Sequence, residues 1–245
     1  MKKWIAFVLF WTLALHGIAQ TANHMILDKN SVVKDETGNV YTYVVWQRLL
    51  ETGLYSAKPD EKGGFVLFRM SEEQIKRSMA LKQVGMEAMP KPRSSEVFVE
   101  GKKFKGDRFT ALDRQKFDIK PNDGKLYVIN FWFINCPPCK KEIPELNKLV
   151  EKYKGQEDIV FIGVALDNAF DLKNFLRINP FNYHIVADGR FYSEKYGVKS
   201  YPTHVIVGKD GLIKFSAIGL ASNTVHWIDK VIQEQTATKV NEADD

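Results

Sequence analysis

The feature that most constrains the fold is an apolar run that leads directly into a pair of cysteines. Leu126 to Ile134 is long and apolar enough for a buried strand, and Cys136-Pro137-Pro138-Cys139 follows it at once. A helix that begins at this motif places Cys136 at its N-terminus, where free backbone N–H groups and the helix dipole favour a thiolate. Pro137 suits the first helical position, which needs no N–H donor. The sequence therefore predicts a strand, a turn and a helix that carries a reactive dithiol.

Two structural roles for the cysteines are less favoured than a redox role. Cys136 and Cys139 are the only cysteines, and a disulfide that closes so short a loop restrains the unfolded chain weakly. A closed zinc site needs four ligands, and no second C-x-x-C or H-x-x-x-H motif supplies the rest. The histidines beyond residue 19 are scattered, at His24, His184, His204 and His226. We therefore expect no metal and no cofactor other than a redox-active Cys136–Cys139 disulfide.

The start of the chain has the pattern of a secretory signal peptide over residues 1–19. Lys2 and Lys3 precede the apolar stretch Trp4 to Leu15, and Gly17-Ile18-Ala19 has the small-x-small pattern of a cleavage site. A retained membrane anchor is the alternative, but about a dozen apolar residues is short of the roughly twenty that span a bilayer. We expect an exported protein, soluble in the periplasm or another extracytoplasmic compartment after cleavage.

The charge of the chain gives no sign of a nucleic-acid partner. The 245 residues carry a formal net charge of +5, which falls to +3 when Lys2 and Lys3 are removed with the signal peptide. Basic pairs such as Lys102-Lys103 and Lys140-Lys141 are interleaved with acids, as on an ordinary solvated surface.

The segment after the cysteines alternates between helical and strand patterns. Helical spacing continues to Gly155, and the β-branched run Ile159 to Leu166 predicts a second buried strand, so the unit is a right-handed βαβ with parallel strands. Asp210-Gly211 is a hairpin signal between two antiparallel strands. The later elements expected are a helix at 170–178, a strand at 183–187, a short helix at 191–196, strands at 204–207 and 212–216, and a helix capped by Asn223.

The order of these elements and three short motifs resemble a known family. The motifs are Asn130-Phe131-Trp132, the stretch CPPCKKEIP at 136–144, and Tyr201-Pro202-Thr203. Together they resemble the TlpA/ResA-like exported thiol-disulfide oxidoreductases of the thioredoxin superfamily. The resemblance covers about Gly106 to Gln235. It implies an α/β, thioredoxin-like fold with a central mixed sheet flanked by helices.

The resemblance also implies roles for individual residues. Cys136 would be the exposed nucleophile and Cys139 the buried resolver, which agrees with their places at the helix start and one turn inside it. Pro202 would be a cis-proline beside the disulfide, leaving the backbone of Tyr201 free to pair with an extended substrate. Glu142 would be a buried acid that accepts the proton of the resolver; a solvated helix glutamate is the alternative.

The chain departs from the common pattern at two positions. Asn130 stands where thioredoxin has a buried aspartate, and an asparagine cannot accept the proton, which leaves Glu142 as the only acid proposed near the thiols. Asn135 replaces the usual tryptophan before the first cysteine, which reduces the apolar rim of the site. Trp132 is expected to pack at the edge of the site. The candidate substrate-binding residues are therefore Tyr201, Pro202, Trp132 and Asn135.

Residues 20–105 match no known pattern and form the N-terminal segment. The turn-like stretch Asp35 to Asn39 precedes an apolar run at 40–46, Phe65 to Met70 is a strand candidate, and Ser71 with Gln74 fits a capping box. Met89 to Ser95 is typical of a linker or extended arm. The segment is either a small α+β module or an elaboration packed on the thioredoxin-like domain, which is expected over 106–238 before an acidic tail at 239–245.

The expected function is an exported thiol-disulfide oxidoreductase. The resemblance favours a reductant of disulfide-containing proteins, recharged by a membrane-embedded thiol electron donor, in cell redox homeostasis, with cytochrome c maturation as one pathway. The strongest oxidants have a histidine between their cysteines, which this chain lacks, but a disulfide oxidant is the nearest alternative. A partner-binding protein built on a thioredoxin scaffold and a peroxide reductase are the others.

Overall fold

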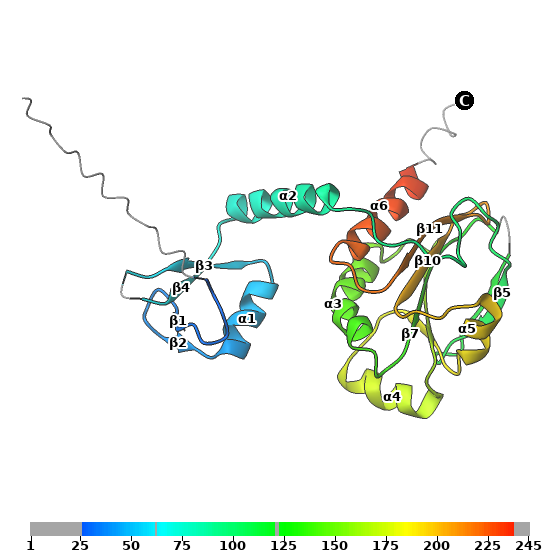
Figure 1. Ribbon diagram of the computed structural model, residues 1–245, viewed down its shortest axis with the longest axis horizontal. Helices are drawn as coiled ribbons and strands as arrows, with labels where there is room; N and C mark the ends of the chain where they lie inside the picture. The colour runs from blue at the N-terminus through cyan, green and yellow to red at the C-terminus, as the bar shows by residue number, and fades with distance from the viewer. Residues whose placement is uncertain (1–25, 62, 121–122, 238–245) are drawn as a thin grey trace, which may run out of the picture. The chain divides into compact units, whose positions relative to one another are not determined.

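The computed structural model describes residues 26–61, 63–120 and 123–237 (Figure 1). The expected signal peptide and acidic tail lie outside these ranges. The described residues divide into two compact units between Met79 and Ala80. The division falls earlier than the predicted boundary at 105/106, because residues 80–105 belong to the C-terminal unit. No helix within the described ranges is both long enough and apolar enough to cross a membrane.

The N-terminal unit is a small α+β module with a core of its own. Its sheet has the order β2-β1-β4-β3, in which β1 and β4 are parallel and the other pairs antiparallel. Trp46 from the helix and Val33, Phe65 and Leu67 from the sheet are buried together. Residues 33–69 thus form an α+β module, whereas residues 80–105 belong to the C-terminal unit. The elements of the module are β1 (Val33–Lys34), β2 (Val40–Tyr41), α1 (Tyr43–Glu51), β3 (Tyr55–Pro59) and β4 (Phe65–Arg69).

Helix α2 (Glu72–Ala88) begins at the predicted capping box. The Gln74 N–H donates to Ser71 Oγ at 3.2 Å, and the Ser71 N–H donates to Gln74 Oε1 at 2.9 Å. Each side chain thereby satisfies a backbone donor at the start of the helix. None of the residues of α2 is buried.

The C-terminal unit is built on a mixed five-stranded sheet with the order β11-β10-β7-β8-β9. The strands β7, β8 and β9 are parallel, and β10 pairs antiparallel with both β7 and β11. Every residue of β7 and β8 is buried, as expected for central strands covered on both faces. The predicted central mixed sheet is therefore confirmed. The strands are β7 (Leu126–Trp132), β8 (Ile159–Ala165), β9 (His184–Val186), β10 (Thr203–Val207) and β11 (Ile213–Ile218).

Helices flank this sheet (Figure 1). Helix α3 (Pro137–Lys152) packs beside α6 (Thr224–Ala237) on one face, and Lys152 Nζ lies 2.6 Å from Asp229 Oδ2 between them. The buried cluster on this face includes both cysteines and Leu172 from α4 (Ala169–Ile178). Helix α5 (Arg190–Tyr196) contributes Tyr196 to a second cluster on the opposite face.

A hairpin that the sequence did not predict and an extended arm complete the unit. Strands β5 (Asp107–Thr110) and β6 (Lys116–Ile119) form an antiparallel hairpin that buries Phe109 in the second cluster. The predicted arm continues along the free edge of β11, where the Ile218 N–H donates to Arg93 O at 2.9 Å and the Ile213 N–H to Lys102 O at 2.9 Å. The arm thus covers an edge strand whose backbone groups would otherwise lack partners.

Candidate active site

The two cysteines lie where β7 passes into α3. Cys136 is the N-cap of α3, with extended backbone angles, and its Sγ accepts a hydrogen bond of 3.2 Å from the Cys139 N–H. The pair is joined by a disulfide, and the two Cα atoms are 5.3 Å apart. The predicted positions of both cysteines at the start of the helix therefore hold. At an N-cap, the helix dipole and free N–H groups stabilise a thiolate once the disulfide is reduced.

Cys136 is more buried than expected. Its exposed fraction is 3%, against 1% for Cys139, whereas the sequence predicts an exposed nucleophile. The half-buried rings of Phe133 and Tyr201 pack edge to face with their centroids 5.4 Å apart, against the cluster that contains Cys136. These rings add apolar surface next to the cluster. Asn135, in the predicted rim, is exposed.

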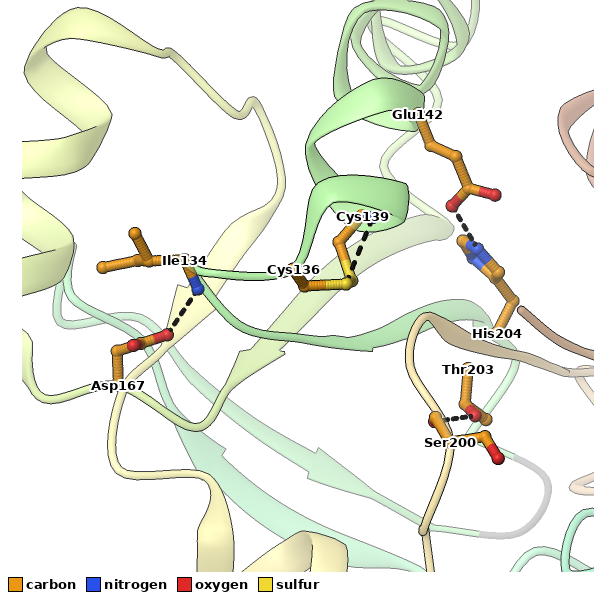
Figure 2. The surroundings of a disulfide bond; sticks show 8 residues. All are labelled: Ile134, Cys136, Cys139, Glu142, Asp167, Ser200, Thr203 and His204. Carbon is orange, nitrogen blue, oxygen red and sulfur yellow. Dashed lines mark hydrogen bonds and ion pairs between the residues drawn. A yellow bond between two sulfur atoms is a disulfide. The ribbon is translucent and has the colours of Figure 1, made fainter. Parts of the chain in front are cut away.

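The turn before the cysteines is tied to the end of the neighbouring strand. The Ile134 N–H donates to Asp167 Oδ2 at 2.7 Å, and Asp167 follows directly on β8 (Figure 2). Asp188 N–H in turn donates to the carbonyl of Asp167 at 2.9 Å. Asp167 is not among the candidate residues predicted from the sequence, although an acid at the C-terminal end of a buried parallel strand is a recognisable signal for a site.

The loop before β10 carries the predicted cis-proline. The Tyr201–Pro202 peptide bond is cis, which confirms the expectation from the motif. Thr203 Oγ1 donates to the Ser200 carbonyl at 2.7 Å (Figure 2). The Gly219 N–H donates to the Pro202 carbonyl at 2.8 Å, so the loop is fixed on both sides. Pro202 is buried and Tyr201 is half-buried.

Glu142 forms a buried pair with a histidine that the sequence analysis left unassigned. Glu142 lies one turn after Cys139 on α3, and its Oε2 is 2.9 Å from Nε2 of His204, the second residue of β10 (Figure 2). The Glu142 side chain is 4% exposed and that of His204 is 0% exposed. The buried position predicted for Glu142 is thus correct. Its place beside β10 depends on tertiary packing, which the sequence pattern does not report.

Other buried polar groups surround this pair. Asn130 of β7 is directly opposite His204 in the strand register and is 1% exposed. Neither polar atom of its side chain has a hydrogen-bond partner among the described residues. Burial, and then the charge of Glu142, raise the pKa of Tyr183 well above its usual range, so its phenol stays protonated. The site is therefore a group of buried polar side chains inside an apolar cluster, with little access to water.

Trp132 lies in the core. Its side chain has no exposed surface and packs against Phe175 and Phe181, with ring centroids 5.8 Å and 5.4 Å away. A ring without exposed surface cannot touch a substrate on the surface, so Trp132 has the expected packing role and not the predicted substrate-binding one. Within the described residues, no three His, Cys, Asp or Glu side chains gather as metal ligands.

Comparison with known proteins finds similar sequences for the C-terminal unit. Residues 101–216 match the model of the AhpC/TSA family. The thiol-disulfide oxidoreductase ResA of Bacillus thuringiensis (strain Al Hakam) is 33% identical over 112 residues, which are 45% of this chain and 64% of ResA. Sporulation thiol-disulfide oxidoreductase A of Bacillus subtilis (strain 168) is 27% identical over 117 residues, 45% of this chain and 70% of that protein. The chain thus spans less than two thirds of the matched ResA.

A solved structure shares the fold of the C-terminal unit. A Chlorobium tepidum protein assigned as thiol:disulfide interchange protein DsbE is 21% identical, with a TM-score of 0.51 over 56% of this chain and 98% of that one. The sheet order, the cysteines at the start of α3 and this likeness show that the C-terminal unit has a thioredoxin-like fold. Within this fold, the C-terminal unit is similar in sequence to ResA-type thiol-disulfide oxidoreductases.

Proposed function

We propose that the protein is an exported thiol-disulfide oxidoreductase that reduces disulfides in other proteins through Cys136 and Cys139. The observation that carries the proposal is the disulfide between the N-cap of α3 and the residue one turn inside the helix. Such a bridge closes too short a loop to restrain the unfolded chain effectively. It does place one sulfur at the positive end of a helix dipole. The names of the ResA and sporulation oxidoreductase relatives support the same activity.

The reaction has two exchange steps. The Cys136 thiolate attacks one sulfur of a substrate disulfide, so that a mixed disulfide forms and the other substrate sulfur leaves as a thiolate. Cys139 then attacks Cys136 Sγ, which closes the Cys136–Cys139 disulfide and releases the second substrate thiolate. The substrate gains two electrons and the enzyme loses two. A membrane-embedded dithiol donor returns the enzyme to its reduced state.

Glu142 is the proton acceptor of the second step. Cys139 is deeply buried, so no bulk water reaches it to remove its proton. Glu142 lies one turn further along the same face of α3, and its Oε1 has no hydrogen-bond partner among the described residues. A carboxylate oxygen with a free lone pair accepts a proton, whereas the amide of nearby Asn130 does not.

The substrate would bind at the loop before β10 and at the rim of the cysteines. The backbone of Tyr201 is the candidate for strand-like pairing with an extended segment, beside Pro202 and the exposed side chain of Asn135. The reducing direction, the membrane donor, export to an extracytoplasmic compartment and a place in cytochrome c maturation are parts of the same proposal, suggested by the family resemblance.

A Cys139→Ala variant tests the activity directly. Without the resolving sulfur, Cys136 should remain joined to its substrates, and mass spectrometry should find mixed disulfides at Cys136 in cells. Cys139→Ala/Cys136→Ser is the matched control and should trap nothing. An empty Cys139→Ala trap contradicts a protein substrate. Full rescue of a deletion strain by Cys136→Ser favours the partner-binding alternative instead.

The direction of electron flow is tested by the potential of the dithiol. Equilibration of the purified protein with dithiothreitol or glutathione buffers gives the midpoint of the Cys136–Cys139 couple. A reductant is expected toward the thioredoxin end of the known range, and a midpoint well above about -150 mV identifies an oxidant instead.

A further inference from the structure

We propose that His204 is a positioning residue that keeps Glu142 ionised and oriented, so that Glu142 can take the proton of Cys139 in the second exchange step. The inference rests on the proposed thiol-disulfide exchange and assigns a role to a residue outside the C-x-x-C helix. It starts from one contact: Nε2 of His204 lies 2.9 Å from Oε2 of Glu142, and both side chains are buried.

The backbone holds the two partners in fixed places. Glu142 projects from the second turn of α3, and His204 from β10, whose neighbours β7 and β11 pair with it on both sides. His204 and Ile206 are two residues apart on β10, so their side chains point to the same face of the sheet. Ile206 belongs to the cluster that contains the cysteines, so the His204 ring faces α3. Figure 2 shows the carboxylate and the imidazole pointing toward each other on the side of α3 that carries Cys139.

The hydrogen-bond inventory of the pair defines its protonation. Nδ1 of His204 has no partner among the described residues. A doubly protonated ring would bury a second N–H donor without an acceptor, so the favoured form is the neutral ring with its proton on Nε2. Nε2–H then donates to Oε2 of Glu142 and stabilises the carboxylate. This leaves Oε1, which also has no partner, as the acceptor for a proton.

Few other titratable groups face this pair. Cys136 and Cys139 share helix α3, while Lys140 and Lys141 on that helix are exposed to solvent. Tyr183, which precedes β9, is fully protonated at neutral pH, and α6 contributes the half-buried His226. The facing position on β7 is Asn130, and the cluster residues from β11 are apolar. Among the described residues, no lysine or arginine forms an ion pair with Glu142.

His204 therefore decides whether Glu142 can act as a base. A buried carboxylate that lacks a donor avoids the cost of its charge by taking up a proton from solvent. In the second step the Cys139 proton moves to Glu142 Oε1, the Cys139 sulfur attacks Cys136 Sγ, and the substrate sulfur leaves as a thiolate. Glu142 later returns the proton to solvent. A Glu142 that is already protonated blocks the first of these transfers.

A chromogenic nitrobenzoate disulfide separates the two steps in one experiment. Reduced protein should release a first nitrothiolate when Cys136 attacks the reagent and a second when Cys139 resolves the mixed disulfide. Stopped-flow absorbance across a range of pH then gives both rates. The comparison uses the full-length protein and the variants His204→Phe, His204→Gln, Glu142→Gln and His204→Phe/Glu142→Gln. Ile206→Val, on the same strand and face, is the control for packing.

We expect only the rate of release of the second nitrothiolate to change. His204→Phe should slow it roughly 10-fold or more at neutral pH, since general base catalysis is lost, and should leave the first release nearly unchanged. His204→Gln, which keeps an N–H donor, should recover part of the rate. In the Glu142→Gln background, His204→Phe should slow the second release no further, because the two residues act as a unit. Ile206→Val should resemble the wild type.

Two outcomes overturn the inference. Equal slowing of both releases by His204→Phe, or effects of His204→Phe and Glu142→Gln that simply add, would mean that His204 only fills space. If His204→Phe does not fold, His204→Val removes the same donor with a side chain suited to a buried strand and takes its place. A wild type that releases only one nitrothiolate, or none, refutes the proposed function itself, which separates that failure from a failure of the role of His204.

Discussion

The backbone N–H of Ile134 donates a hydrogen bond of 2.7 Å to the carboxylate of Asp167, which lies 33 residues later in the chain. This contact joins the turn that leads to Cys136 to the end of β8, so the start of α3 is fixed by the sheet as well as by its own helix. Two buried parallel strands, β7 and β8, thus hold the active-site turn in place.

Replacement of Asp167 tests this contact. Asp167→Ala leaves the Ile134 N–H without its acceptor, and we expect a loss of about 1–3 kcal/mol in the free energy of unfolding, the usual value for a hydrogen bond to a charged group. Urea unfolding of the oxidised protein, followed by near-ultraviolet circular dichroism, measures it. Asp167→Asn keeps an acceptor oxygen and should lose less. Equal losses in the two variants would show that the charge matters, and the hydrogen bond does not.

A glycine beside the same strand end should not tolerate a side chain. A Cβ at Gly189 would lie 2.6 Å from Val164 Cγ1 and 2.7 Å from the Ala165 carbonyl oxygen, which is backbone and cannot rotate away. Gly189→Ala should therefore destabilise the C-terminal unit by about 1–3 kcal/mol in urea unfolding. Gly85→Ala is the control, because nothing lies within 4 Å of that Cβ in helix α2. A Gly189→Ala variant as stable as Gly85→Ala contradicts the prediction.

The stabilisation from the ion pair between Lys152 of α3 and Asp229 of α6 should depend on pH. Burial raises the pKa of Asp229, but Lys152, Tyr153 and Gln233 lower it more, so the folded-state pKa is below the ordinary value. The stabilisation from this carboxylate is then complete above the unfolded pKa of about 3.9 and is lost as pH falls through the folded value. Asp229→Asn should cost about 1 kcal/mol at neutral pH.

Urea unfolding of the wild type and Asp229→Asn at several pH values measures this dependence. The difference in stability should stay constant down to about pH 4 and shrink below it, because the wild-type carboxyl also becomes neutral there. A difference that does not shrink in acid would mean that Asp229 contributes through packing and not through its charge.

The ring of Tyr201 should control access to the nucleophile. Tyr201 and Phe133 pack against the cluster in which Cys136 is 3% exposed. Tyr201→Ala should therefore speed the alkylation of reduced Cys136 by iodoacetamide several-fold, as read by mass spectrometry, while Tyr201→Phe keeps the ring and the wild-type rate. If both variants react at the wild-type rate, the ring does not shield the sulfur.

Several features followed from the sequence because their signals are local. The capping box of Ser71 and Gln74, the N-cap position of Cys136 and the turn at Asp210-Gly211 each depend on residues a few positions apart. The order of strands and helices after Leu126 followed in the same way from period and length. The cis-proline followed from its motif, because the same residues occur around it in a known family.

Tertiary structure alone decided the environment of the dithiol. His204 meets Glu142 across 62 residues, and the arm at 93–104 meets β11 across more than a hundred, where sequence periodicity carries no information on partners. The burial of Trp132 likewise depends on Phe175 and Phe181, which come from other segments of the chain. The sequence determined that a dithiol begins a helix after a buried strand, since backbone capping and strand period act over a few residues. Which groups surround that dithiol was decided by the packing of a helix on a sheet, which acts through space.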